Sequence, residues 1–167
     1  MYGQGGTNGL DSWSVAAINS TGALADVGYA VCVNPTESDW AVVTGDQIGT
    51  LSFELGRRGA AADEAPLCGV VTTAGADGKW IQVKLVGIAE GKFNSSKTGG
   101  SAVAVVGSPL TWSDNLAGSF EAAASGQPVI AYALETIAQE ASANWTVVTA
   151  PTIRVLMVAP GIHCDMQ

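Results

Sequence analysis

The stretch PLCGVVTTAGADGKWIQVKLVGIAEGKF, residues 66–93, decides the fold. Its apolar start, residues 67–71, is followed by small residues that end in the pair Asp77-Gly78, which accepts a positive φ angle in a tight turn. After the turn the chain alternates with a period of two, the pattern of a strand with one buried face: Ile81, Val83 and Leu85 fall on one side, Gln82 and Lys84 on the other. The stretch therefore predicts a β-hairpin.

The sequence on both sides of the hairpin is also typical of strands. Before it, we expect a strand with one buried face over 27–33, a short strand over 40–44 and another over 51–55. After it, we expect short strands at 102–106, 129–134, 145–148 and 153–158, a second hairpin that pairs 111–112 with 118–120, and one short helix over 135–143. Short strands separated by turn signals every 8–12 residues predict an all-β sandwich or barrel, mainly β with one or two short helices.

The chain divides into three parts by composition. Residues 1–24 are rich in glycine and lack a strand or helix period, and Tyr2, Leu10 and Trp13 are isolated apolar residues in them. This part is either a frayed terminus or an N-terminal arm that orders against a partner. Residues 25–160 form the β domain, and residues 161–167 form a polar C-terminal tail.

Charged residues are scarce. They make up 13% of the chain, about half the usual share, and the net charge is −8. The first basic residue is Arg57, and six acids precede it. This balance excludes disorder driven by charge and a coiled coil, and it argues against nucleic acid as a partner. We also expect no membrane span and no secretory signal, because the chain lacks a long apolar run and a basic N-terminal region.

No residue pattern indicates catalysis. The single histidine, His163, lies on the polar tail beside Cys164, so neither a nucleophilic triad nor a metal site with convergent ligands is expected there. Cys32, Cys68 and Cys164 are widely spaced, which predicts reduced thiols. We therefore expect no enzyme, no metal and no cofactor. A cleft built from acids far apart in the chain is the one route to an enzyme that spacing leaves open.

The five tryptophans are the main candidates for recognition. All five are expected at strand edges or turns, at positions 13, 40, 80, 112 and 145. They can be core residues that close the ends of a barrel, anchors of a protein interface, or an aromatic platform for carbohydrate.

Two segments carry a resemblance to a known family. The apolar Gly-Val-Val strand, small-residue hairpin and alternating strand of 66–93 (PLCGVV…WIQVKLVGIAEG), together with GQPVIAYALE at 126–135, resemble the capsid decoration proteins of bacteriophages, also called head-stabilising or cement proteins. The lambda decoration protein belongs to that family, and the present chain is similar to its longer relatives over roughly residues 25–158.

The resemblance implies a small β-barrel or β-tulip-like domain with an extended N-terminal arm. It implies a structural protein, made in the host cytoplasm and carried on the outer capsid surface of the virion, that clamps neighbouring subunits of the major capsid protein and assembles with itself as a homotrimer. Candidate interface residues are Tyr2, Leu10, Trp13, Trp40, Arg57, Arg58 and Trp112. The alternatives are another phage structural β-protein (tail tube, head fibre or spike) and a carbohydrate-binding β-domain.

Overall fold

The computed structural model describes residues 12–34, 51–56, 68–95, 103–138 and 146–158. These residues contain nine strands and no helix. The strands are β1 (Trp13–Asn19), β2 (Ala30–Val33), β3 (Ser52–Leu55), β4 (Cys68–Thr73), β5 (Trp80–Lys92), β6 (Pro109–Trp112), β7 (Phe120–Ala122), β8 (Ala131–Ala133) and β9 (Thr152–Met157). The all-β prediction is confirmed, and no helix long and apolar enough to cross a membrane occurs in the described part of the chain.

The predicted hairpin is present as β4 and β5. The two strands are antiparallel, with Val71 opposite Val83, and Gly78 in the connecting turn has a φ of 71°. The alternation of β5 matches its burial: Ile81, Val83 and Leu85 are buried, whereas Gln82 is exposed.

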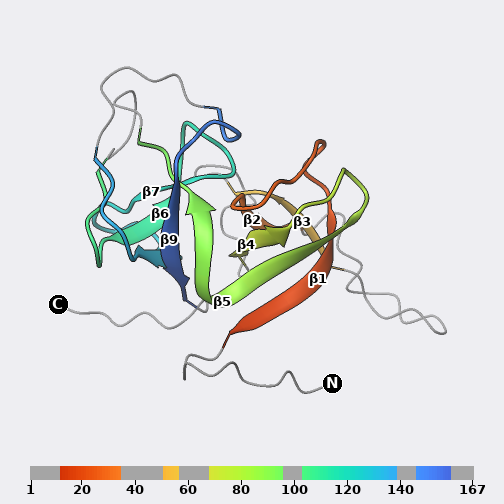
Figure 1. Ribbon diagram of the computed structural model, residues 1–167, viewed down its shortest axis with the longest axis horizontal. Coiled ribbons are helices and arrows are strands. Elements are labelled where there is room, and N and C mark those ends of the chain that lie inside the picture. Colours follow the sequence, from red (N-terminus) through yellow and green to blue (C-terminus); the bar gives the residue numbers. More distant parts are fainter. Residues whose placement is uncertain (1–11, 35–50, 57–67, 96–102, 139–145, 159–167) are drawn as a thin grey trace.

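Five strands form a closed barrel in the order β1-β3-β2-β4-β5, and β5 pairs back to β1 (Figure 1). All of these pairings are antiparallel except β1 with β3. The expectation that residues 1–24 lack strand structure is therefore wrong for 13–19, which supply β1. Only Ala17 and Asn19 of β1 are fully buried, so its amphipathic pattern is weak, and pairing with strands on both sides makes it a strand.

The longest strand, β5, takes part in two sheets. It pairs with β1 as far as Val86 and with β9 from Gly87 onward. Gly87 has a φ of 101°, which an L side chain rarely adopts, and β5 bends sharply in Figure 1 as it passes from the barrel to the second sheet. The second sheet runs β5-β9-β8-β6-β7, and a parallel bridge between Phe93, just after β5, and Phe120 of β7 joins its last strand to its first.

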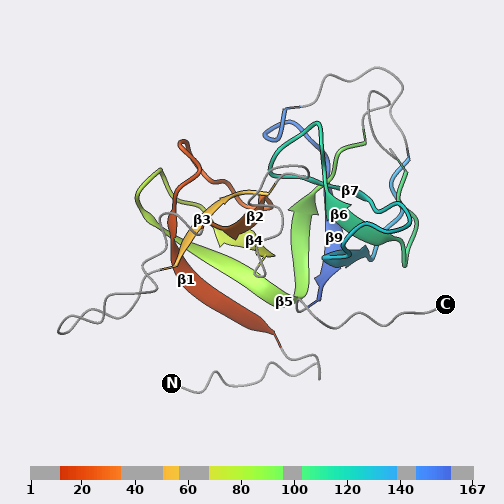
Figure 2. The same ribbon diagram turned by 180° about the vertical axis from the view of Figure 1, so that it is seen from behind.

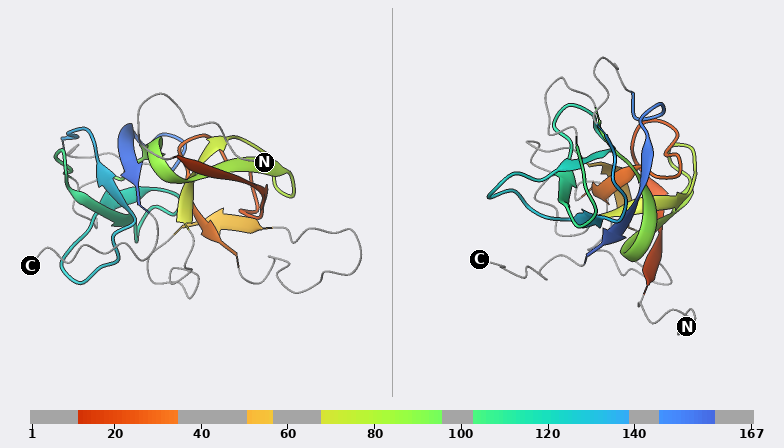
Figure 3. Two further views of the ribbon diagram at one scale, coloured as in Figure 1. Left: turned by 90° about the horizontal axis from the view of Figure 1, so that it is seen from below. Right: turned by 60° about the vertical axis from the view of Figure 1, so that its left-hand side comes forward.

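The barrel and the second sheet lie side by side, as Figures 2 and 3 show. The barrel encloses one core, which includes Val31, Phe53 and Val83. A second core fills the space between the outside of β2 and β4 and the inner side of the second sheet, and includes Cys32, Val70 and Trp112. All four residues of β2 are buried, because one face of the strand points into each core. The prediction of a single buried face for this segment is therefore wrong.

The smaller elements agree only in part with the sequence analysis. The hairpin of 111–112 with 118–120 is confirmed, with Trp112 opposite Phe120, and so are the strands expected at 51–55, 129–134 and 153–158. Residues 103–106 form only the isolated bridge of Ala104 with Ile137. Residues 135–138 contain the end of a bend and that bridge instead of a helix start, and residues 146–149 form a turn instead of a strand. The predicted strand at 40–44 lies outside the described residues.

Candidate interface surface

The structure describes two of the seven candidate interface residues. Tyr2, Leu10, Trp40, Arg57 and Arg58 lie outside the described residues, so their role stays a prediction. Trp13 opens β1 and Trp112 closes β6. The two tryptophans differ in exposure, and the difference separates the core interpretation from the two surface interpretations.

Trp112 packs in the core between the barrel and the second sheet. It is 2% exposed. Its indole rests against Gly56 so closely that a Cβ atom there would lie 2.1 Å from Nε1 and 2.2 Å from Cδ1. Trp112 thus presents no surface to a partner in this structure, and it fits the core interpretation.

Trp13 belongs to an exposed apolar group at the bend of β5. Trp13 is 59% exposed, and it pairs with Val86 across the ribbon of β1 and β5, next to a register shift between Trp13 and Ser14. Two residues further along β5, on the same side of the strand, Ile88 is also exposed. Trp13 and Ile88 thus leave exposed apolar side chains where β5 leaves the barrel, whereas Val86 between them is half-buried and packs against the barrel core.

Trp80 lies at the other end of this ribbon. Trp80 is 62% exposed, and it pairs with Ile18 of β1. Because directly opposed residues project from the same face of a sheet, the outward residues form one surface, which we call the outer ribbon face. It consists of Trp13, Ser14, Ala16, Ile18, Trp80, Gln82, Lys84 and Ile88.

The outer ribbon face carries little charge. Lys84 is its one charged residue, and the Nζ atom of Lys84 donates a hydrogen bond to the Ile88 carbonyl oxygen at 3.0 Å. From Trp80 to Ile88 the face extends roughly 26 Å along β5, at about 3.3 Å per residue. A long face with one charged residue and an indole towards each end has the composition of an interface core.

Sequence reasoning missed Trp80 and Ile88 as members of a surface. The signal was present in the alternation of β5, because these residues share the even-numbered side with Gln82 and Lys84. Apolar side chains on the face that should meet water are the pattern that marks a binding surface.

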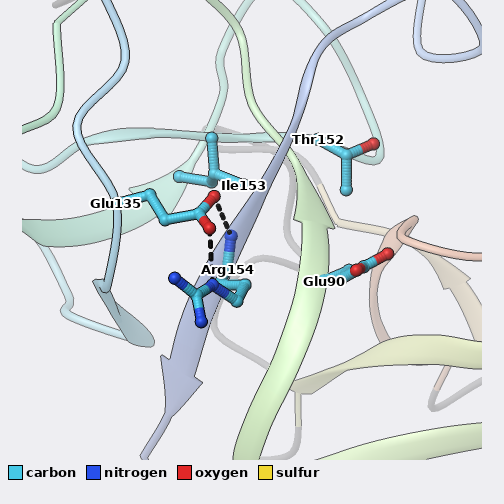
Figure 4. Close-up of a pocket in the computed structure, with 5 residues that line it drawn as sticks. All are labelled: Glu90, Glu135, Thr152, Ile153 and Arg154. Atoms are coloured by element: carbon cyan, nitrogen blue, oxygen red, sulfur yellow. Dashed lines mark hydrogen bonds and ion pairs between the residues drawn. The ribbon is translucent and has the colours of Figure 1, made fainter.

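A small open pocket lies on the second sheet (Figure 4). It has a volume of about 340 Å³ and is lined by Glu90, Glu135, Thr152, Ile153 and Arg154. Arg154 donates to Glu135 twice, from Nε to Oε1 at 2.5 Å and from its backbone N–H to Oε2 at 3.1 Å. These hydrogen bonds lower the pKa of Glu135 below its ordinary value.

The pocket has the features of a structural contact. Glu135 follows β8 and Arg154 lies on β9, so the ion pair fastens the chain after β8 to the neighbouring strand. Glu90 is opposite Arg154 in the strand register, but Figure 4 shows its carboxylate directed away from the guanidinium group. Among the described residues no group of three or more His, Cys, Asp or Glu side chains could hold a metal ion.

Comparison with known proteins finds a likeness of fold. No family model and no curated protein sequence matches the chain. Among solved structures, the N base of the head fibre gp8.5 of bacteriophage phi29 has a similar fold, with a TM-score of 0.51 and 12% sequence identity. The match covers 92% of this chain and 99% of that one. The fold of this chain, with its barrel and attached second sheet, is therefore similar over almost its whole length to that of a phage head-fibre base.

Proposed function

We propose that this chain is a structural protein of a bacteriophage virion that binds the outer surface of the mature capsid. The observation that carries the proposal is the likeness of fold to the N base of the phi29 head fibre, which extends over almost the whole of both chains. A match of this extent involves both the barrel and the second sheet, and thus more than a common barrel motif.

The outer ribbon face supports a role in assembly. A fully exposed indole offers about 250 Å². At 59% and 62% exposure, Trp13 and Trp80 together leave on the order of 300 Å² of their surface in water, before Ile88 and the other apolar residues are added. A stable interface uses about 800 Å² on each partner. The outer ribbon face is large enough to form the centre of such an interface, with polar neighbours as its rim.

The composition of the chain agrees with such a position. Charged residues are depleted from interface cores, and this chain has 13% of them. A net charge of −8 also suits a site outside the shell, away from the negatively charged packaged DNA.

The partners in this proposal are the major capsid protein and further copies of the chain, in a homotrimer. By binding across neighbouring capsid subunits only when they have reached their mature spacing, the protein would stabilise the expanded shell by mass action. The fold likeness favours one alternative within the same class, in which the chain is the base of a head fibre and attaches an appendage to the shell. The two roles predict the same docking to the capsid, but only the first predicts a more stable shell.

Binding to capsids tests the proposal. Purified protein would be mixed with expanded heads that lack it, sedimented, and quantified in the pellet. We expect saturable binding by the unchanged chain, and binding at least tenfold weaker for Trp13→Ser and Trp80→Ser. The matched control is Val148→Ser, because Val148 is 62% exposed but lies on a turn outside the outer ribbon face, and this variant should bind normally.

Two results would contradict the proposal. One is an unchanged chain that stays in the supernatant with every form of the head. The other is binding to an array of glycans that both tryptophan substitutions abolish, which would identify the exposed indoles as a carbohydrate platform. Heating bound and bare heads then separates the two virion roles: a higher disruption temperature for bound heads indicates a clamp, and an unchanged one indicates a fibre base.

A further inference from the structure

Two cysteines lie directly opposite each other on neighbouring strands of the barrel. Cys32 of β2 is directly opposite Cys68 of β4, and both are thiols in this structure. We infer that this pair is a site of disulfide formation, in which oxidation joins the two Sγ atoms and staples β2 to β4. The inference concerns a covalent modification of the barrel and does not depend on the proposed function.

The backbone geometry fits the bond. The N–H of Ala30 donates to the Gly118 carbonyl, and its own carbonyl accepts from the Gly56 N–H, so the polar backbone groups of Ala30 point away from β4. Backbone direction alternates along a strand, so those of Cys32, two residues on, also point away. Cys32 and Cys68 are thus a non-hydrogen-bonded antiparallel pair, whose Cα atoms lie about 4.5 Å apart. Disulfides accept Cα separations of about 4.4 to 6.8 Å.

The side chains also share one environment. Directly opposed residues project from the same face of the sheet, and both cysteines belong to the core between the barrel and the second sheet. Cys32 is fully buried and Cys68 is 6% exposed. The two Sγ atoms therefore approach each other in an apolar space, without any change in the strand register.

Burial controls when the bond forms. It raises the pKa of the Cys68 thiol to about 12, and the thiolate is the attacking species in disulfide exchange. Oxidation of the folded protein should therefore be slow at neutral pH. A folding chain, whose thiols are still in water, should react much faster with an oxidant.

The chemistry with oxidised glutathione as the oxidant is balanced. One cysteine thiolate attacks the glutathione disulfide and releases the first glutathione thiolate. The second cysteine then attacks the mixed disulfide, forms the Cys32–Cys68 bond and releases the second glutathione. The protein loses two protons and two electrons, and the glutathione disulfide gains them.

The bond would close a loop of about 35 residues. Closing a loop of this size restricts the unfolded chain, and for a protein of this length the expected result is a melting temperature about 10 °C higher. The reduced and oxidised forms should therefore be distinguishable by melting as well as by mass.

The test uses the full-length chain with Cys164→Ser, so that Cys32 and Cys68 are its only cysteines. The protein is unfolded, refolded in a buffer of oxidised and reduced glutathione, and digested without reduction. We expect a mass lower by about 2 Da, the cross-linked pair of peptides that contain Cys32 and Cys68, and the higher melting temperature. Cys68→Ala in the same background should show none of the three changes.

Three outcomes would overturn the inference. They are two thiols that still react with a thiol reagent after refolding, a protein that ends as a mixed disulfide with glutathione, and a Cys32–Cys68 bond that leaves the melting temperature unchanged or lower. A second arm incubates the native protein with oxidised glutathione at pH 9 for several days. If refolding yields no soluble protein, the presence or absence of the cross-linked peptides in this arm decides.

Discussion

Replacement of Gly91 by alanine should destabilise the second sheet, because Gly91 lies on β5 against the ring of Phe120. A Cβ atom at this position would lie 2.5 Å from Cε2 and 2.8 Å from Cδ2 of Phe120. Ordinary carbon contacts are about 3.5 to 4.0 Å, so the ring would have to move by about 1 Å. Phe120 is fully buried, and its carbonyl accepts a hydrogen bond of 2.8 Å from the Asn94 N–H, which limits that movement.

The expected loss follows from this crowding. Forcing an extra methyl group into a well-packed core costs about 1–3 kcal/mol, and the fixed position of Phe120 points to the upper end, about 3 kcal/mol. For a chain of this length, that lowers the melting temperature by about 9 °C. Thermal unfolding followed by circular dichroism measures the change. In a double-mutant cycle, Gly91→Ala combined with Phe120→Leu should be more stable than the two single losses predict, because the smaller side chain makes room for the methyl group.

Gly78→Ala is the matched control. Gly78 has a φ of 71°, and a Cβ atom added to it would meet nothing within 4 Å, so only the backbone conformation opposes alanine there. That costs about 1–2 kcal/mol, or roughly 4 °C. A Gly91→Ala protein that melts within 1 °C of the unchanged chain would refute the reasoning, because Phe120 could not then be packed on β5.

Three further changes test other parts of the structure. Asn19→Ala removes buried hydrogen bonds from Nδ2, including one of 2.8 Å to the Gly75 carbonyl, and should cost about 2–3 kcal/mol in a urea titration. Gly87→Ala places a side chain at a φ of 101° and should lower the melting temperature by about 5 °C, whereas Gly87→Asn, which tolerates positive φ better, should lower it less. Glu135→Gln removes the carboxylate whose pKa Arg154 lowers, so it should slightly lower the melting temperature above pH 4.5, and the difference should vanish as the pH falls through that lower pKa. Equal melting curves for Glu135→Gln and the unchanged chain at pH 7 would contradict the last prediction.

The parts of the fold that the sequence predicts well are local. The hairpin of β4 and β5 follows from a clear period of two and from a turn at Gly78 that needs a positive φ. Strand β9 follows in the same way from its own alternation. In each case the pattern that identifies the strand lies within the strand itself.

The parts that the sequence does not predict depend on distant partners. β1 has few buried side chains, and its strand character comes from pairing with β5 and β3. β2 is buried on both faces because the second sheet packs on the outside of the barrel, which no local period reveals. The same reason explains why Trp112 is core and Trp13 is surface, although the sequence places both near strand ends.

The outer ribbon face could be predicted from the sequence only in part. Trp80 and Ile88 could have been identified from their parity along β5, since they share the side that carries Lys84. That Trp13 lies on the same surface could not have been identified from the sequence, because this depends on the register of β1 against β5.

Imaging of the virion tests the central claim most directly. A cryo-electron microscopy map of particles from the phage whose genome encodes this chain should contain density for a barrel and an attached second sheet on the outer capsid surface, with the outer ribbon face buried against neighbouring protein. The proposal is contradicted if the fitted chain is absent from the head, or if it is present with Trp13 and Trp80 facing solvent in every copy.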